Sequence, residues 1–205
     1  PDIVEVLRDY RSEVVVAQGE AFNPTPANIE SRTIRTTLPG GMRLALLQKK
    51  TRGSTVVAQI GLQWGDETSK AGRNVACGIA SAMLQRGTQK RSREQLSVEF
   101  SRLKATVGIS GEGASIQTIR DNLPEALRLI AEVLRQPTFP EAEFEQLRRA
   151  SISGLEAQRS EPTALSGLEL RRHLDPYPPE HWLYNTSIDE RIERIKNVRL
   201  EDVRA

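Results

Sequence analysis

Two histidines, His173 and His181, are the side chains best suited to bind a transition metal or to act as a general base. Eight positions separate them, and Pro176, Pro178 and Pro179 interrupt that segment, so one helix face cannot present both imidazoles to a metal. No H-E-x-x-H or H-x-x-E-H motif is present. We therefore predict packing or surface roles for both histidines.

Patterns for a nucleophile or a phosphate loop are equally weak. A Ser-His-Asp triad would need one of the two histidines, and no G-x-S-x-G elbow is present to expose a serine. Gly108, Gly111 and Gly113 do not open into a helix, as a phosphate loop requires, so they predict a turn. The single cysteine, Cys77, excludes an internal disulfide, and its apolar neighbours predict a small buried side chain rather than a nucleophile.

Three glutamates close together in the sequence, Glu156, Glu161 and Glu169, could supply paired carboxylates for acid–base chemistry. Three arginines interleave with them, which is typical of ion pairs on the surface of helices. These arginines are Arg159, Arg171 and Arg172. The segment therefore predicts surface ion pairs.

The composition indicates a globular chain of 205 residues, long enough for one sizeable core. Hydrophobic residues make up 38% and charged residues 27%, which is too apolar for a disordered chain. The 29 basic and 27 acidic residues are scattered, so no basic stripe predicts a nucleic-acid partner. No apolar run approaches the roughly 20 residues that span a bilayer. Because the chain starts with Pro1 rather than Met, we expect a piece of a longer protein.

The first 31 residues predict a linker or extension with little core of its own, because proline, asparagine and glutamine surround one short apolar stretch. Residues 32–205 are expected to form one domain, truncated at its C-terminal end. Within it, segments 33–38 and 42–47 flank a Pro-Gly-Gly turn and predict a β-hairpin. A third strand is expected at 54–64.

Apolar stripes at helical spacing mark three helices that should face the core. The stripes are Val75, Ile79 and Met83 in segment 72–84; Leu96, Phe100 and Leu103 after a cap at Ser92; and Leu123, Leu127, Ile130 and Leu134 after a cap at Asp121-Asn122. Two short strands are expected at 106–110 and 114–119, and further helices from Pro140, from Pro162 and within 189–205. This order predicts an α+β fold, a largely antiparallel sheet with helices packed on one face.

Three local strings, in this order of elements, resemble the insulinase-like zinc metallopeptidases, also called the pitrilysin family or inverted zincins. The resemblance covers about residues 33–205 and implies the metallohydrolase fold of mitochondrial processing peptidase. The strings are L-P-G-G-M-R-L-A-L-L at 38–47, M-L-Q-R-G-T at 83–88, and L-R-Q-P-T-F-P-E-A-E-F at 134–144.

The resemblance also implies where metal ligands would stand. Active members carry H-x-x-E-H on the helix before the M-L-x-x-G-T string, where two imidazoles bind zinc and the glutamate activates water. In this sequence those slots fall on Gly78, Ser81 and Ala82, and none of these residues can ligate zinc or take up a proton. The resemblance therefore implies a degenerate, metal-free site.

The third zinc ligand of the family is a glutamate eight or nine residues before a proline that begins the next helix. That proline matches Pro162, so the slot falls on Ser153 or Gly154. Glu156 is nearby, but its use would need a shift of register. No catalytic, cofactor-binding or metal-binding residue is therefore expected in this chain.

The resemblance implies a non-catalytic unit of a zinc metalloendopeptidase, which helps to form the chamber and hold peptide substrates for a catalytic unit elsewhere. Zinc would belong to that catalytic repeat or subunit, which would be the partner, in a bacterial protein of the periplasm or outside the cell. Two other hypotheses remain: a structural or assembly subunit on the same scaffold, and an unrelated enzyme with a novel site.

Overall fold

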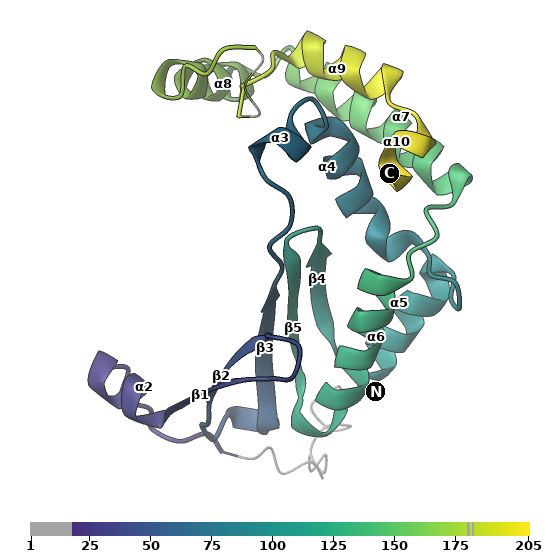
Figure 1. Ribbon diagram of the computed structural model, residues 1–205. Coiled ribbons are helices and arrows are strands. Elements are labelled where there is room, and N and C mark those ends of the chain that lie inside the picture. Colours follow the sequence, from purple (N-terminus) through teal and green to yellow (C-terminus); the bar gives the residue numbers. More distant parts are fainter. Residues whose placement is uncertain (1–17, 180, 182) are drawn as a thin grey trace, which may run out of the picture. The chain divides into compact units, whose positions relative to one another are not determined.

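The computed structural model describes residues 18–179, 181 and 183–205, drawn as a ribbon in Figure 1. The described chain divides into two compact units. The first holds the described residues up to Val56 together with Ile119–Asp121, and the second holds Val57–Thr118 and Asn122–Ala205. The predicted linker lies partly outside the described residues, and its boundary at residue 32 stays a prediction.

The first unit contains the predicted hairpin. Strands β1 (Thr33–Thr37) and β2 (Arg43–Leu47) pair antiparallel, which confirms the prediction. In the turn between them, Gly40 and Gly41 take φ values of 95° and 85°. Two glycines stand there because residues with a Cβ rarely adopt such positive φ values.

Little of the first unit is buried. Helix α2 (Pro26–Arg32) precedes the hairpin, within the segment expected to be a linker, and none of its residues is buried. A proline is tolerated at its start because the first amides of a helix have no helical partner. On the hairpin, Ile34 and Leu46 lie opposite each other, with 61% and 50% of their surface exposed.

The second unit contains a three-stranded sheet in the order β3-β5-β4. Strand β3 spans Thr55–Gly61, and β4 (Thr106–Ser110) pairs antiparallel with β5 (Gly113–Ile119). Gly113 has a φ of 141°, and a Cβ there would lie 1.8 Å from the carbonyl oxygen of Ile60. The pairing of β3 with β5 therefore requires glycine at this position.

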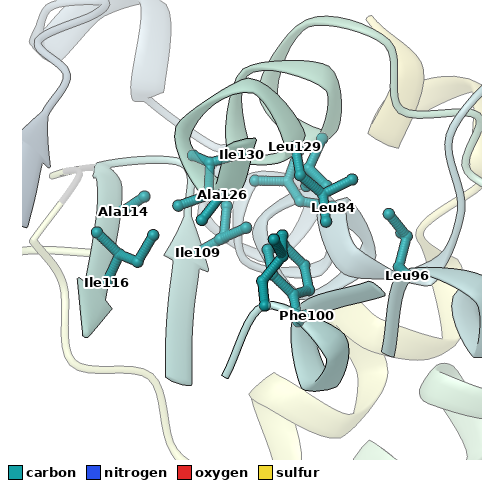
Figure 2. Packing of buried hydrophobic residues seen from close by; sticks show 11 residues of the cluster. Leu84, Leu96, Phe100, Ile109, Ala114, Ile116, Ala126, Leu129 and Ile130 are labelled. Carbon is teal, nitrogen blue, oxygen red and sulfur yellow. The ribbon is translucent and has the colours of Figure 1, made fainter. Parts of the chain in front are cut away.

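Helices α5 (Arg93–Arg102) and α6 (Leu123–Arg135) cover one face of this sheet (Figure 1). Their apolar side chains meet those of β4 and β5 in one continuous cluster, shown in Figure 2. Ile130 is fully buried at its centre. Burial of a side chain of this size stabilises the fold by about 1.5–3 kcal/mol. The cluster, referred to below as the sheet core, comprises Leu84, Leu96, Phe100, Leu103, Ile109, Ala114, Ile116, Ala126, Leu129, Ile130 and Val133.

Helix α5 matches its prediction closely. The Ser92 hydroxyl accepts the N–H of Gln95 at 3.3 Å, and the Gln95 side chain accepts the N–H of Ser92 at 2.8 Å. This reciprocal capping box satisfies amides that have no helical partner. The predicted stripe of Leu96, Phe100 and Leu103 is buried, as expected.

Helix α6 differs from its prediction in two respects. Asn122 stands at its N-cap but makes no capping bond. Its side-chain amide donates to the Leu103 carbonyl at 2.9 Å. Of the predicted stripe only Ile130 is buried, while the other three leucines lie at the margins. The buried face is rotated about the helix axis relative to the predicted stripe, and the fully buried Ala126 lies on it. The prediction omitted Ala126 because it considered only large apolar residues. The buried residues are Ala126, Leu129, Ile130 and Val133.

The remaining helices form a second part of this unit. Two smaller apolar clusters join them, one around α4 and one between α7 and α9. The helix that begins at Pro162 has no buried residue. These helices are α3 (Glu67–Lys70), α4 (Asn74–Met83), α7 (Glu141–Gln158), α8 (Pro162–Leu174), α9 (Ile188–Asn197) and α10 (Leu200–Arg204).

The predicted α+β class is confirmed, with the strands divided between a two-stranded and a three-stranded sheet. The helices predicted from Pro140, from Pro162 and within 189–205 are all present. Within the described ranges, each helix is too short or too polar to cross a lipid bilayer.

Candidate functional site

The main concave feature of the helical part is a cavity of about 700 Å³, called here the α4–α7 cavity. Helices α4, α7, α8 and α9 and the segment 184–186 supply its lining, all from the second unit. A volume of this size is typical of small-ligand and peptide side-chain sites. Its position is of interest because α4 and α7 carry the slots to which the sequence assigned the missing metal ligands.

Small residues leave this space open. Gly78 and Ala82 of α4 are exposed and line the α4–α7 cavity. On α7, the half-buried Ser151 and the exposed Gly154 also line it. A Cβ built on Gly78 or on Gly154 would meet nothing within 4 Å. The two helices therefore face each other across residues too short to fill the gap.

The slot predicted for the catalytic glutamate lies apart from the cavity lining. Ser81 is half-buried, and its hydroxyl accepts the N–H of Gly111 at 3.0 Å, in the turn between β4 and β5. The indole N–H of Trp64 donates to the Gly111 carbonyl at 2.7 Å. Lys70 lies over the Trp64 ring, 4.9 Å from its centre. Ser81 thus ties α4 to the end of the sheet.

The two alternatives for the third ligand differ in position. Gly154 lines the α4–α7 cavity together with Gly78 and Ala82. Ser153 and Glu156 are exposed on α7 and are not among the lining residues. Of the two predicted positions, only Gly154 therefore lies beside Gly78 and Ala82, and which of the two corresponds to the family's glutamate stays a prediction.

Three arginines give the cavity its charge. Arg171 from α8 and Arg191 and Arg194 from α9 line it, and no aspartate or glutamate does so in the described part of the chain. Tyr184 also lines it, and its hydroxyl lies 3.3 Å from a carboxylate oxygen of Glu190. The N–H of Ser187, with this hydroxyl in a smaller role, holds the pKa of Glu190 below its ordinary value of 4.5.

The two histidines lie outside the cavity. His173 is exposed on α8, whereas His181 follows the end of that helix and stacks on Tyr177 with ring centres 4.3 Å apart. The Nδ1 atom of His181 accepts the N–H of Leu183 at 3.1 Å. No group of three histidine, cysteine, aspartate or glutamate residues suited to hold a metal occurs among the residues described.

Two other predictions need correction. Cys77 is half-buried rather than buried, because it lies at the edge of the α4 face that packs against the neighbouring helices. Of the three arginines expected to pair with nearby glutamates, only Arg172 does so among the residues described, with Glu169 at 3.5 Å. Arg159 pairs instead with Asp189 on α9, because the fold brings α9 beside α7.

No protein-family model matches the sequence, and no curated protein matches it at a significant level. Solved structures do match its fold. The peptidase M16 inactive domain from Pseudomonas fluorescens has a TM-score of 0.68 and 21% identity, covering 84% of this chain and 42% of that one. A protease from Helicobacter pylori has a TM-score of 0.65 and 17% identity, again covering 84% and 42%. The periplasmic protease PqqL from Escherichia coli has a TM-score of 0.61 and 13% identity, covering 92% and 20%.

This chain thus spans less than half the length of each of these structures. At such low identities the likeness is one of fold. It agrees with the resemblance carried by the strings at 38–47, 83–88 and 134–144. The chain therefore has the α+β fold of the insulinase-like (M16) peptidases, a group that includes a domain described as inactive.

Proposed function

We propose that this chain is a non-catalytic unit of an insulinase-like zinc metalloendopeptidase, which helps to form the peptide chamber for a catalytic unit elsewhere. One observation carries the proposal. Gly78 and Ala82, at two predicted ligand slots, and Gly154, one of the two positions predicted for the third, line one cavity between α4 and α7. The space for a metal site is present, while the side chains that would form it are not.

Zinc chemistry explains why this arrangement should be inactive. A catalytic zinc needs three nitrogen, oxygen or sulfur ligands and an open position for water. Glycine and alanine side chains offer no such atom, and Ser81 is a poor substitute for a glutamate that takes a proton from water. Hydrolysis would then require a second unit that holds the zinc. The match to a periplasmic protease supports a location in the periplasm.

The register of the three slots can be tested by installing ligands. We expect the variant Gly78→His, Ala82→His, Gly154→Glu to bind about one zinc per chain, while the parent chain retains none after dialysis. The matched control carries Ser153→Glu in place of Gly154→Glu, and it should bind zinc more weakly because residue 153 does not line the cavity. Metal analysis and cobalt absorption spectra would measure both.

Two results would contradict the proposal. One is a tightly held zinc in the unmodified chain. The other is a folded triple variant, judged by circular dichroism, that binds zinc no better than its Ser153→Glu control. A structural subunit on the same scaffold is distinguished by peptide binding: a substrate-holding unit should bind an unfolded peptide saturably, and a purely structural unit should not.

A further inference from the structure

We propose that the α4–α7 cavity is a binding site for acidic peptide segments, whose carboxylates are held by Arg171, Arg191 and Arg194. The proposal rests on the proposed function only in taking the ligand to be a peptide. The preference for negative charge follows from the cavity alone. All three arginines line it from two helices, and none forms an ion pair within the part of the chain described.

The acidic residues of α8 and α9 do not neutralise these arginines, because each has another partner. The chain as a whole is nearly balanced in charge, with 29 basic and 27 acidic residues. Three arginines without acidic partners are therefore a local excess of positive charge. The partners are as follows: Glu169 with Arg172, Asp189 with Arg159, Glu190 with Ser187 and Tyr184, and Glu193 with Lys196.

Arg194 is shared with a smaller neighbouring cavity that Glu193 and Asp202 also line. Asp202 accepts bonds from Arg199, and Glu193 lies 2.8 Å from the Lys196 ammonium. Arg171 and Arg191 line only the α4–α7 cavity among the cavities described, so they should contribute most to the binding of an anion.

The closed N-terminus of α9 argues against a phosphate site built on that helix end. Phosphate sites commonly use free amides at a helix N-terminus. The N-terminus of α9, beside the cavity, is closed by its own capping box: the Ser187 N–H donates to Glu190 at 2.7 Å, and the Glu190 N–H donates to the Ser187 hydroxyl at 3.1 Å. A negative charge already lies at that end, so α9 offers an anion its arginine side chains rather than its amides. The first residues of α4, Asn74 and Val75, also line the cavity. Guanidinium groups bind carboxylates in a planar, two-bond geometry.

Apolar residues complete the match to a peptide. Ile79 and Leu155 are buried at the cavity wall, and Leu147 and Leu168 are half-buried beside them. The methylene groups of a glutamate, or an apolar neighbour in the peptide, can contact this wall while the carboxylate reaches the arginines. Such a mixture of apolar walls and a few convergent polar groups is typical of binding sites.

Fluorescence anisotropy with labelled peptides would test the inference on the whole chain. The probe is an amidated peptide in which glutamate alternates with leucine, and the matched probe has glutamine at each glutamate position. A third peptide, with glutamine and a free C-terminal carboxylate, separates side-chain from terminal carboxylates. We expect the glutamate peptide to bind about tenfold more tightly than its glutamine counterpart, a difference that shrinks as salt is raised.

The double variant Arg171→Gln, Arg191→Gln should remove most of that preference. Arg149→Gln is the control, because Arg149 is exposed on α7 and does not line the cavity. Equal binding of the two amidated peptides, or an equal loss in the Arg149→Gln control, would overturn the inference. Saturable binding of inorganic phosphate as tight as that of the glutamate peptide would overturn the choice of carboxylate.

The outcomes separate this inference from the proposed function. Absence of charge preference, with a zinc site created only by the Gly154→Glu variant, would reject the acidic-peptide site and leave the non-catalytic unit standing. If the unmodified chain holds zinc and the double arginine variant loses the preference for charge, the non-catalytic unit is rejected and the acidic-peptide site is supported.

Discussion

The sheet core and the helical part of the second unit are packed differently, although both belong to one compact unit. The sheet core is one cluster of 11 buried residues. The helices around α4 are held by two separate, smaller clusters, and α8 contributes no buried residue. The cause is the size of the facing side chains: Phe100 and Ile130 fill the first interface, whereas Gly78 and Gly154 leave the second open.

This difference indicates that the closely packed core and the open cavity lie in separate parts of the unit. Close packing in the sheet core makes each side chain costly to change, because its neighbours cannot relax into the gap. The α4–α7 cavity already contains open space, so added atoms there should be tolerated. Substitutions matched between the two parts can test the contrast.

The largest effect is expected from Gly113→Ala. Its Cβ would lie 1.8 Å from the Ile60 carbonyl oxygen, and the φ of 141° disfavours any L side chain. We expect a loss of at least about 3 kcal/mol in the free energy of unfolding, or failure to fold. Gly154→Ala is the control and should lose nothing. Urea denaturation measures both, and similar midpoints for the two variants would refute the contrast.

A smaller but still large effect is expected from Ile130→Ala in the sheet core. Ile130 is 0% exposed, and its removal should lower the free energy of unfolding by about 2–4 kcal/mol through lost contacts and a cavity. Leu165→Ala on α8, where 40% of the leucine is exposed, should change it by less than about 1 kcal/mol. Equal losses would show that α8 is packed as tightly as the sheet core.

The third prediction concerns Glu132, which joins α6 to the loop before α5. Burial raises its pKa, but bonds from the Thr88 hydroxyl, at 2.7 Å, and from Arg91 outweigh burial, so the pKa lies below the ordinary 4.5. A lowered folded-state pKa contributes stability that is present above pH 4.5 and is lost as pH falls through the lowered value.

Glu132→Gln should therefore lower the free energy of unfolding by about 1 kcal/mol at neutral pH, and the difference should narrow in acid. Thermal unfolding measured from neutral pH down to about pH 3, a range that passes through the ordinary carboxyl pKa, would show it. Glu125→Gln, with a side chain 55% exposed, is the control and should show a smaller difference. A stability difference between Glu132→Gln and the parent chain that stays constant across this pH range would contradict a stabilising role for the ionised Glu132.

The smallest effect has the opposite sign. Gly78→Ala adds a Cβ that meets nothing within 4 Å, in the middle of an exposed helix face. We expect about 0.5–1 kcal/mol of added stability, because alanine loses less backbone freedom on folding and favours helix. A rise of the melting temperature measures it. A fall would mean that α4 and α7 approach more closely in solution than the open cavity indicates.

Local signals explain which elements could be predicted from the sequence. The hairpin was marked by its Pro-Gly-Gly turn, and α5 by a cap at Ser92 followed by an apolar stripe. Such signals depend on neighbours a few residues apart, so no knowledge of the rest of the fold is needed. The buried stripe of α5 could be predicted because Leu96, Phe100 and Leu103 are large apolar residues that recur at helical spacing.

The rotated face of α6 and the charge of the cavity depend on distant parts of the chain. Ala126 faces the core because the sheet lies there, and its small size gives no signal in a search for apolar stripes. Arg171 looked like one more member of a surface ion-pair network, since nothing in its neighbourhood shows that α8 and α9 meet across a cavity. The choice between Ser153 and Gly154 likewise needed the position of α4.

The hydrogen bond from the Gly111 amide to Ser81 bears on whether such a unit could regain catalysis in evolution. Replacing Ser81 with glutamate would remove the hydroxyl that accepts this bond and place a longer, charged side chain at a half-buried position. We therefore expect a Ser81→Glu change to destabilise the fold, and it would bring no catalytic benefit until zinc ligands are also present. If the unit descends from an active one, the bond between the Gly111 amide and Ser81 makes the loss of catalytic activity harder to reverse.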